Sequence, residues 1–158
     1  MSDLHELFAT GTVPKTLNGF HPGSLEKLYP KTFIEHLGRY IFPLWLPWYG
    51  KEFDSTAKRG INRVPAVLEP IARARYGNRA IGDKIGYAIR AFPFATKDTT
   101  ALKDTTKVLQ LSYDLPENPP TIRAIVDELV ELDDKYLGKA YTKEGTDYRL
   151  LAMFSLEK

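Results

Sequence analysis

Apolar and polar side chains alternate most regularly over Val108–Leu115, in the second half of the chain. Three leucines and Tyr113 occupy every second position of this segment, and polar residues stand between them. This two-residue period is typical of a strand with one buried face. The apolar runs Tyr87–Phe94 and Tyr148–Leu156 predict two more strands, the first of them near a sheet edge because it contains Pro93.

Helical spacing is found nearer the N-terminus. The apolar side chains of Asp3–Thr10 fall on one side of a short helix. A longer helix is predicted at Lys31–Phe42, where Pro30 suits the first helical position and Pro43 cannot continue the helix. We therefore expect an N-terminal helix that packs on, or caps, the sheet formed by the later strands.

Two segments have less regular patterns. Ile71–Tyr76 alternates apolar and basic residues, which favours a strand with one solvent-facing side. Ile122–Leu132 fits a helix by its apolar spacing, and it also fits a strand that turns at Asp133–Lys135 into a second strand at Tyr136–Tyr141. The late strands are joined by short turns without intervening helices. A mainly β fold with a minor helical part is therefore expected, with antiparallel strands and one domain for 158 residues.

Composition excludes several kinds of chemistry. The chain has no cysteine, which excludes disulfides, thiolate catalysis and cysteine-ligated metals. Its histidines, His5, His21 and His36, are too widely spaced to indicate a metal-ligand pair, so we expect neither a metal nor another cofactor. The first residues carry acids rather than a basic-then-apolar run, so the expected location is the cytoplasm.

Charge is uneven along the chain, although the net charge is only +2. Lys58–Arg79 holds six basic residues and one acid, whereas Asp114–Asp134 holds seven acids and one base. Such segments are most often solvated faces or lie near each other; an anionic headgroup, phosphate or RNA is the alternative partner of the basic segment. Because that segment lacks the regular aromatic residues of a single-strand platform, no nucleic-acid partner is expected.

Both tryptophans, Trp45 and Trp48, lie in the proline-containing stretch Ile41–Phe53. The uncharged run around them, Tyr40–Gly50, has eleven residues, whereas a membrane-spanning helix needs about 20. The protein is therefore expected not to be transmembrane. Three interpretations of the stretch remain open: core packing, the wall or lid of a ligand pocket, and a surface patch that docks another protein.

Arg90 is the most informative polar residue of the predicted strands. The two-residue period of a strand would place it on the same face as Phe92, and hence in the interior. A buried guanidinium needs a partner. Glu117, Asp127 or Asp114 could supply it from within the protein, and a ligand carboxylate could supply it from outside.

A resemblance to a group of uncharacterised bacterial proteins is carried by five ordered segments: Leu17–Gly23, Trp45–Lys51, Arg90–Phe94, Tyr113–Pro119 and Tyr136–Lys139. The last third also resembles lipocalin-like, calycin-type barrels of the GXWXG and DUF4334 kind, through an Asp-containing strand, a turn at Leu137 and Gly138, and a final apolar strand. The chain departs from that pattern at Asn18–Gly23, where Gly-x-Trp-x-Gly would stand. The resemblance implies a closed antiparallel β-barrel with an apolar interior and a strand at Ile122–Leu132.

A small barrel can hold one apolar molecule. We therefore expect binding of a small hydrophobic or amphiphilic molecule, such as a lipid, fatty acid or isoprenoid-like compound. The residues expected to line the site are Trp45, Trp48, Tyr87, Arg90, Phe92 and Tyr113. One alternative is an isomerase or cyclase for an apolar substrate, whose acid or base would come from Tyr87, Tyr113, His21 or Asp127. The other is a docking domain that uses residues 41–53; the oligomeric state stays open.

Overall fold

The computed structural model describes residues 3–29, 31 and 48–158. Its strands are β1 (Gly19–Leu28), β2 (Gly50–Asp54), β3 (Arg59–Pro65), β4 (Ile81–Ile85), β5 (Ala88–Thr100), β6 (Lys107–Ser112), β7 (Ile125–Glu131), β8 (Lys135–Glu144) and β9 (Asp147–Glu157). Its helical elements are α1 (Leu4–Thr10), the 3-10 turn η1 (Ala66–Leu68), α4 (Glu69–Tyr76) and α5 (Pro120–Arg123).

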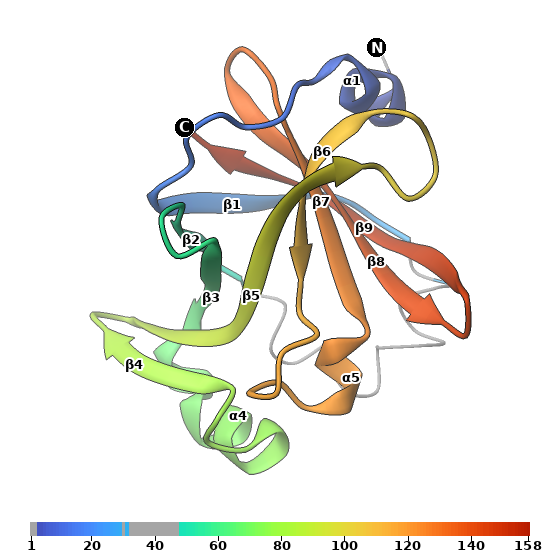
Figure 1. The fold of residues 1–158 in the computed structure, drawn as a ribbon. Helices are drawn as coiled ribbons and strands as arrows, with labels where there is room; N and C mark the ends of the chain where they lie inside the picture. Colours follow the sequence, from blue (N-terminus) through green and yellow to red (C-terminus); the bar gives the residue numbers. More distant parts are fainter. Residues whose placement is uncertain (1–2, 30, 32–47) are drawn as a thin grey trace.

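The strands form one antiparallel sheet that closes on itself (Figure 1). The order is β3-β2-β1-β9-β8-β7-β6-β5, and the pairing of β3 with β5 completes the ring. Strand β4 stays outside the ring because it pairs with residues 88–91 of β5, whereas β6 pairs with residues 95–100. The expected mainly β fold with a closed antiparallel barrel is confirmed.

Helix α1 packs on the outer face of the barrel. Asp3 begins the helix, because its side chain accepts a hydrogen bond from the backbone N–H of His5. Phe8 is fully buried in a small apolar cluster with Val130 of β7 and Leu137 of β8. A short helix is thus present at the residues for which the sequence predicts one, and it packs on the outside of the barrel wall.

The main core lies inside the barrel. Its buried side chains come from all the barrel strands except β1, and also from α4, β4 and α5. Ala72 and Tyr76 of α4 and Ile122 of α5 belong to this core. Both helices lie at the lower end of the barrel in Figure 1, so that their side chains close that end.

A bulge in β5 decides which way its side chains point. The pairing with β3 shifts between Ile61 and Asn62, and Phe92 adopts a positive φ of 56°. Because the extra residue interrupts the two-residue alternation, Phe92 and Phe94 are buried while Arg90 lies on the outer face. The expectation that Arg90 points inward is therefore wrong. Pro93 sits beside this bulge and pairs with Ile61 of β3; on its other side it lies between the residues of β5 that pair with β4 and those that pair with β6, so none of the described strands pairs with it there.

Two other segments differ from, or refine, the sequence-based expectation. Ile71–Tyr76 is helical, not a strand: Pro70 stands in the first turn of α4, and Gly77 ends the helix with a φ of 76°. Ile122–Leu132 divides between the end of α5 and strand β7, so the strand that the resemblance implied is present from Ile125.

The helix predicted at Lys31–Phe42 lies almost entirely outside the described residues. Among the helices that the structure describes, none is long and apolar enough to cross a membrane.

Candidate functional site

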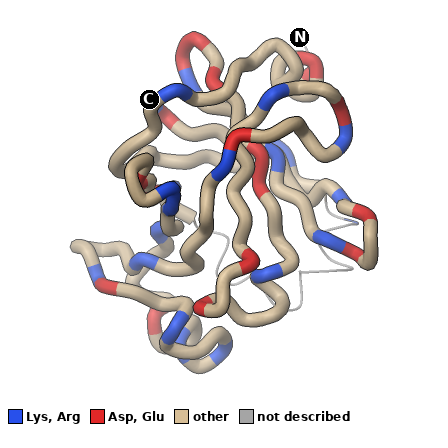
Figure 2. Tube along the Cα trace, viewed as in Figure 1, with Lys and Arg blue, Asp and Glu red and all other residues tan. Residues whose placement is uncertain are grey.

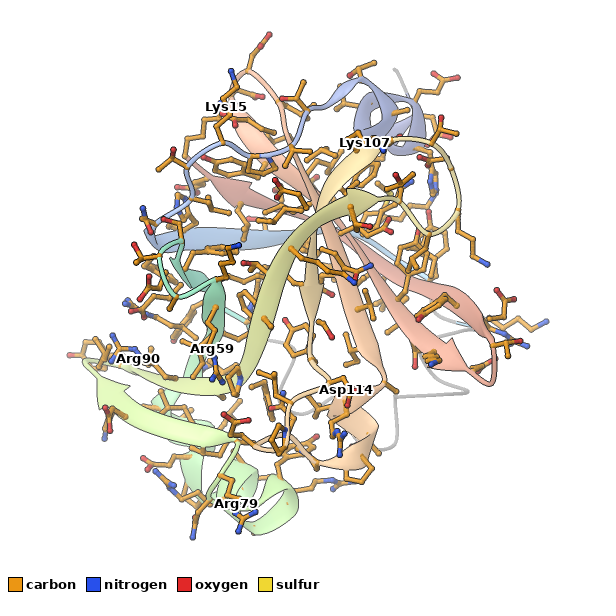
Figure 3. All side chains as sticks on the ribbon, in the orientation of Figure 1. Lys15, Arg59, Arg79, Arg90, Lys107 and Asp114 are labelled. Atoms are coloured by element: carbon orange, nitrogen blue, oxygen red, sulfur yellow. The ribbon has the colours of Figure 1, made fainter. Side chains whose placement is uncertain are left out.

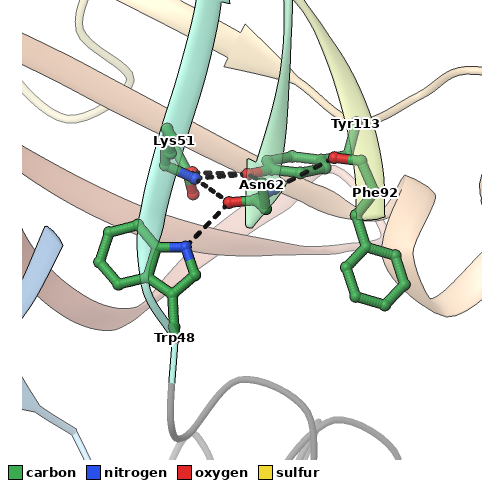
Figure 4. A network of polar contacts seen from close by, with 6 residues as sticks. Trp48, Lys51, Asn62, Phe92 and Tyr113 are labelled. Atoms are coloured by element: carbon green, nitrogen blue, oxygen red, sulfur yellow. Dashed lines mark hydrogen bonds and ion pairs between the residues drawn. The ribbon is translucent and has the colours of Figure 1, made fainter. Parts of the chain in front are cut away.

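Five side chains form a polar network inside the barrel, surrounded by apolar core (Figure 4). Lys51 projects from β2 and Asn62 from β3; Tyr113 directly follows β6, Asp127 lies on β7, and Trp48 precedes β2. Lys51, Asn62, Tyr113 and Asp127 are each at most 2% exposed. The network therefore connects opposite walls of the barrel, since β2 and β7 are not neighbours in the sheet.

The Lys51 ammonium is the centre of this network. Its Nζ lies 2.8 Å from Asp127 Oδ2, and it donates hydrogen bonds to Asn62 Oδ1 (2.8 Å) and Tyr113 Oη (2.6 Å). Its Nζ also lies 5.2–5.3 Å from the ring centroids of four aromatic residues: Trp48, Phe94, Tyr113 and Phe154. Cation–π attraction and the salt bridge thus stabilise a charge that water does not reach.

The remaining members of the network complete one another's hydrogen bonds. Asn62 Oδ1 also accepts from Trp48 Nε1, and Asn62 Nδ2 donates to the Phe92 carbonyl and to Tyr113 Oη. Tyr113 in turn donates to Asp127 Oδ2 (3.1 Å). Among the described residues, Asp127 Oδ1 has no hydrogen-bond partner. The network is therefore nearly saturated, which favours a role in fixing the barrel interior.

Burial perturbs the titration of two of these groups. It lowers the pKa of the Lys51 ammonium, and the Asp127 carboxylate opposes that shift. Burial, followed by the negative charge of Asp127, raises the pKa of the Tyr113 hydroxyl well above its ordinary value. Perturbed groups of this kind also occur in active sites. Here, however, both groups already use their hydrogen bonds on each other and on their neighbours.

A hollow of about 500 Å³ opens at the side of the barrel where the N-terminal segment passes the β2–β3 hairpin. Its apolar lining comes from Pro14, Leu17, Phe53 and Leu109. Leu17 and Phe53 are members of the interior core, so the floor of the hollow is the surface of that core. A cavity of this volume is in the range of small-molecule sites.

The rim of the hollow is charged. It carries four cations, Lys15, Lys58, Arg59 and Lys97, and two anions, Asp54 and Asp98. Lys15 and Arg59 are labelled in Figure 3 on the segments that border it. The Asp54 carboxylate accepts from the backbone N–H of Ala57 in the hairpin turn. The rim therefore has an excess of positive charge above an apolar floor.

Aromatic ring contacts connect this floor with the interior network. Phe53, which lines the hollow, contacts Phe94 with ring centroids 5.4 Å apart. Phe94 contacts Tyr113 at 5.5 Å. A molecule in the hollow would therefore lie two ring contacts from the Lys51 network, in which Trp48 takes part.

The structure brings only some of the expected site residues together. Trp48 and Tyr113 belong to the interior network, and Phe92 contributes its backbone carbonyl while its ring packs against Tyr76. Tyr87 is 92% exposed at the β4–β5 turn. Trp45 lies outside the described residues.

Arg90 is paired on the outer face of the barrel. Arg90 donates hydrogen bonds from Nε and Nη2 to the Glu52 carboxylate, at 3.0 and 2.8 Å. Arg63 donates to the same carboxylate. None of the expected protein partners, Glu117, Asp127 or Asp114, fills this role. Arg90 is therefore a surface ion-pair residue of β5.

Lys51 and Asn62 are the network residues that sequence reasoning missed. Lys51 stands two positions before Phe53, and Asp127 stands midway between Ile125 and Leu129. The two-residue period could therefore have placed both charges on inward faces. Asn62 likewise stands two positions before Val64, a member of the interior core, so the same period could have placed it on the inward face of β3.

Comparison of the chain with protein-family models, with curated proteins and with solved structures found no match.

Proposed function

We propose that the protein binds a small amphiphilic molecule with an anionic head group in the hollow beside the β2–β3 hairpin. The observation that carries this proposal is the combination of an apolar floor with an excess of cations at the rim. An acyl chain would cover Leu17, Phe53 and Leu109. Its carboxylate or phosphate would meet Lys58, Arg59 or Lys97 through charge-assisted hydrogen bonds.

The rim cations can reach such a head group at small cost. Arg59 donates to Glu117 at 2.8 Å, but its side chain is 47% exposed and that of Glu117 is 37% exposed. An exposed pair of this kind contributes about 0–1 kcal/mol. A ligand anion can therefore replace Glu117 without a large loss of stability.

Binding is favoured over catalysis by the state of the interior network. An isomerase or cyclase would need an acid or base that faces its substrate. Tyr113 and Asp127, two of the groups considered for that role, are instead bonded to each other and to Lys51. His21 is also occupied, because its ring nitrogens lie 2.7 and 3.0 Å from the carbonyl oxygens of Glu157 and Asn18.

Calorimetric titration with dodecanoate tests the proposal. Saturable binding is expected, and dodecyltrimethylammonium, which has the same chain and a cationic head, should bind much more weakly. Arg59→Ala should weaken dodecanoate binding about tenfold, since a hydrogen bond to a charged group contributes about 1.5–3 kcal/mol.

Arg123→Ala is the matched control. Arg123 forms a similarly exposed pair with Asp114, at 2.7 Å, away from the hollow. This variant should bind dodecanoate as the parent does. If dodecanoate does not bind, or if both alanine variants weaken it equally, the hollow is not the binding site.

A further inference from the structure

Exposed apolar side chains gather on one lobe of the molecule. Among the described residues, five large hydrophobic side chains are exposed. Val67 (82%), Ile71 (50%) and Tyr87 (92%) belong to the segment 66–87, and Tyr49 (40%) borders it. Leu25, on β1, is the fifth. We call residues 66–87, which comprise η1, α4 and β4 with their turns, the basic lobe.

Backbone contacts hold the two most exposed of these side chains on the same side of the lobe. Gly86, with a φ of 58°, forms the β4–β5 turn and leaves Tyr87 at its tip. The Tyr87 carbonyl accepts a hydrogen bond of 2.7 Å from the backbone N–H of Ala66, the residue before Val67. A hollow of about 490 Å³ is lined by Val67, Lys84 and Tyr87 together with Tyr49. These side chains therefore share one continuous surface.

The same lobe carries the excess positive charge of the chain. It contains Arg73, Arg75, Arg79 and Lys84 against Glu69 and Asp83, a net charge of +2. This equals the net charge of the whole protein, so the remaining residues are neutral on balance. The lobe projects at the lower left of the molecule, with several Lys and Arg positions along it (Figure 2), and Arg79 lies at its lower end (Figure 3).

We propose that the basic lobe docks on an anionic membrane surface. Val67, Ile71 and Tyr87 would enter the headgroup region, where a tyrosine is well placed to keep its hydroxyl in contact with water. Arg75, Arg79 and Lys84 would face the lipid phosphates and carboxylates. Such attraction falls off within a Debye length, so a cation must lie close to the inserted side chains, as Lys84 does, because it lines one hollow with Val67 and Tyr87.

A membrane fits these features better than a protein partner does. Val67 and Tyr87 are almost fully solvated, so each projects beyond its neighbours instead of lying in a flat apolar patch. The core of a protein interface is depleted of charge, whereas four cations accompany the apolar side chains of this lobe. Single projecting side chains among cations suit a soft, anionic and apolar surface.

Co-sedimentation with lipid vesicles tests the proposal. The parent protein should pellet with phosphatidylcholine vesicles that contain about one third phosphatidylserine, and much less with phosphatidylcholine alone. The variant Arg79→Ala/Lys84→Ala should bind the anionic vesicles about 25-fold more weakly, because each surface cation contributes about fivefold. The variant Val67→Ser/Tyr87→Ser should also lose most of its binding.

Two control variants lie outside the basic lobe. Lys107→Ala/Lys143→Ala removes two exposed cations from β6 and β8, and Leu25→Ser removes the exposed apolar side chain of β1. Both should pellet as the parent does. The proposal is overturned if the parent does not bind anionic vesicles, as expected for a protein partner. It is also overturned if it binds neutral vesicles equally well, or if the lobe variants behave like their controls.

Membrane docking by the basic lobe does not require amphiphile binding in the hollow beside the β2–β3 hairpin. A lipid extracted into the hollow would leave the vesicle and stay with the protein in the supernatant, whereas docking brings the protein into the pellet. Arg59→Ala, which should weaken dodecanoate binding, should leave co-sedimentation close to that of the parent. The two proposals can therefore fail separately.

Discussion

Lys51 Nζ and Asp127 Oδ2 lie 2.8 Å apart in the interior of the barrel, and both side chains are almost completely buried. The pair joins β2 to β7, which three other strands separate in the sheet order. Transfer of each charge out of water costs several kcal/mol, so the pair is stable only with both partners present. The pair is therefore a direct contact between two walls that are not paired with each other in the sheet.

Removal of one partner is therefore expected to destabilise the protein strongly. Lys51→Met leaves the Asp127 carboxylate buried without its cation, and the free energy of unfolding should fall by about 3–5 kcal/mol. Urea denaturation measures this. The double variant Lys51→Met/Asp127→Leu should regain a large part of the loss, because no unpaired charge remains. If the single and double variants are equally unstable, packing around the pair, not its charge, determines the effect.

Glu52, on the outer face of β2, makes a pH-dependent contribution to the stability of the fold. Hydrogen bonds from Arg90 lower the pKa of Glu52, and those from Arg63 lower it further, while partial burial opposes the shift. The folded-state pKa is thus below the ordinary value of 4.5, so the carboxylate stabilises the fold above pH 4.5 and loses this effect as the pH falls below it.

Glu52→Gln is expected to be less stable than the parent at neutral pH. The difference should shrink as the pH falls from 4.5 downward, because the parent's carboxylate then becomes protonated as well. Thermal unfolding at a series of pH values measures it. Asp147→Asn, which removes a pair with Lys103 at the protein surface, is the control and should have little effect. A stability difference that stays constant into strong acid would contradict the role of the charge.

Gly138 is expected to tolerate no side chain. A Cβ at this position would overlap the ring of Phe154, which crosses the strand at this point and contacts Trp48. Gly138→Ala should therefore lower the free energy of unfolding by about 1–3 kcal/mol, as overpacked cores do. Gly82→Ala, in β4, is the matched control, since its Cβ would make ordinary contacts with Arg90. Equal stability of the two variants would show that the Phe154 ring moves aside freely.

The sequence predicts those parts of the fold that depend on local pattern. The alternation at Val108–Leu115 places Leu111 and Tyr113 in the core, as expected. Local alternation fails where one residue changes the register, and the bulge at Phe92 reverses the face on which Arg90 lies. It also fails at Ile71–Tyr76, where Pro70 and Gly77 define a helix more strongly than six alternating residues define a strand.

The candidate site is less predictable because its parts come from distant strands. Tyr113 and Trp48 are informative by residue type, but the contact of Lys51 with Asp127 depends on barrel closure, which no local spacing encodes. The hollow beside the β2–β3 hairpin is hard to predict for the same reason. Leu17, Phe53 and Leu109 belong to three separate segments, and their common position follows only from the path of the chain between α1 and β1.

Trp48 should report on occupation of the hollow. Its indole donates to Asn62 Oδ1 at 3.2 Å, and its ring packs edge-to-face on Phe154. The aromatic series from Phe53 through Phe94 to the Lys51 network connects the hollow with this environment. Dodecanoate is therefore expected to change the intrinsic tryptophan emission saturably, with the midpoint found by calorimetry.

Two single-tryptophan variants assign that signal. Trp48→Phe should stay folded, because phenylalanine retains most of the apolar contact, but it should lose most of the emission change. Trp45→Phe, which keeps Trp48, should retain the change. If dodecanoate binds by calorimetry and alters the emission of neither variant, the hollow is not coupled to the Lys51 network. If the emission change persists in Trp48→Phe and disappears in Trp45→Phe, the ligand is sensed by Trp45 and not by the Lys51 network.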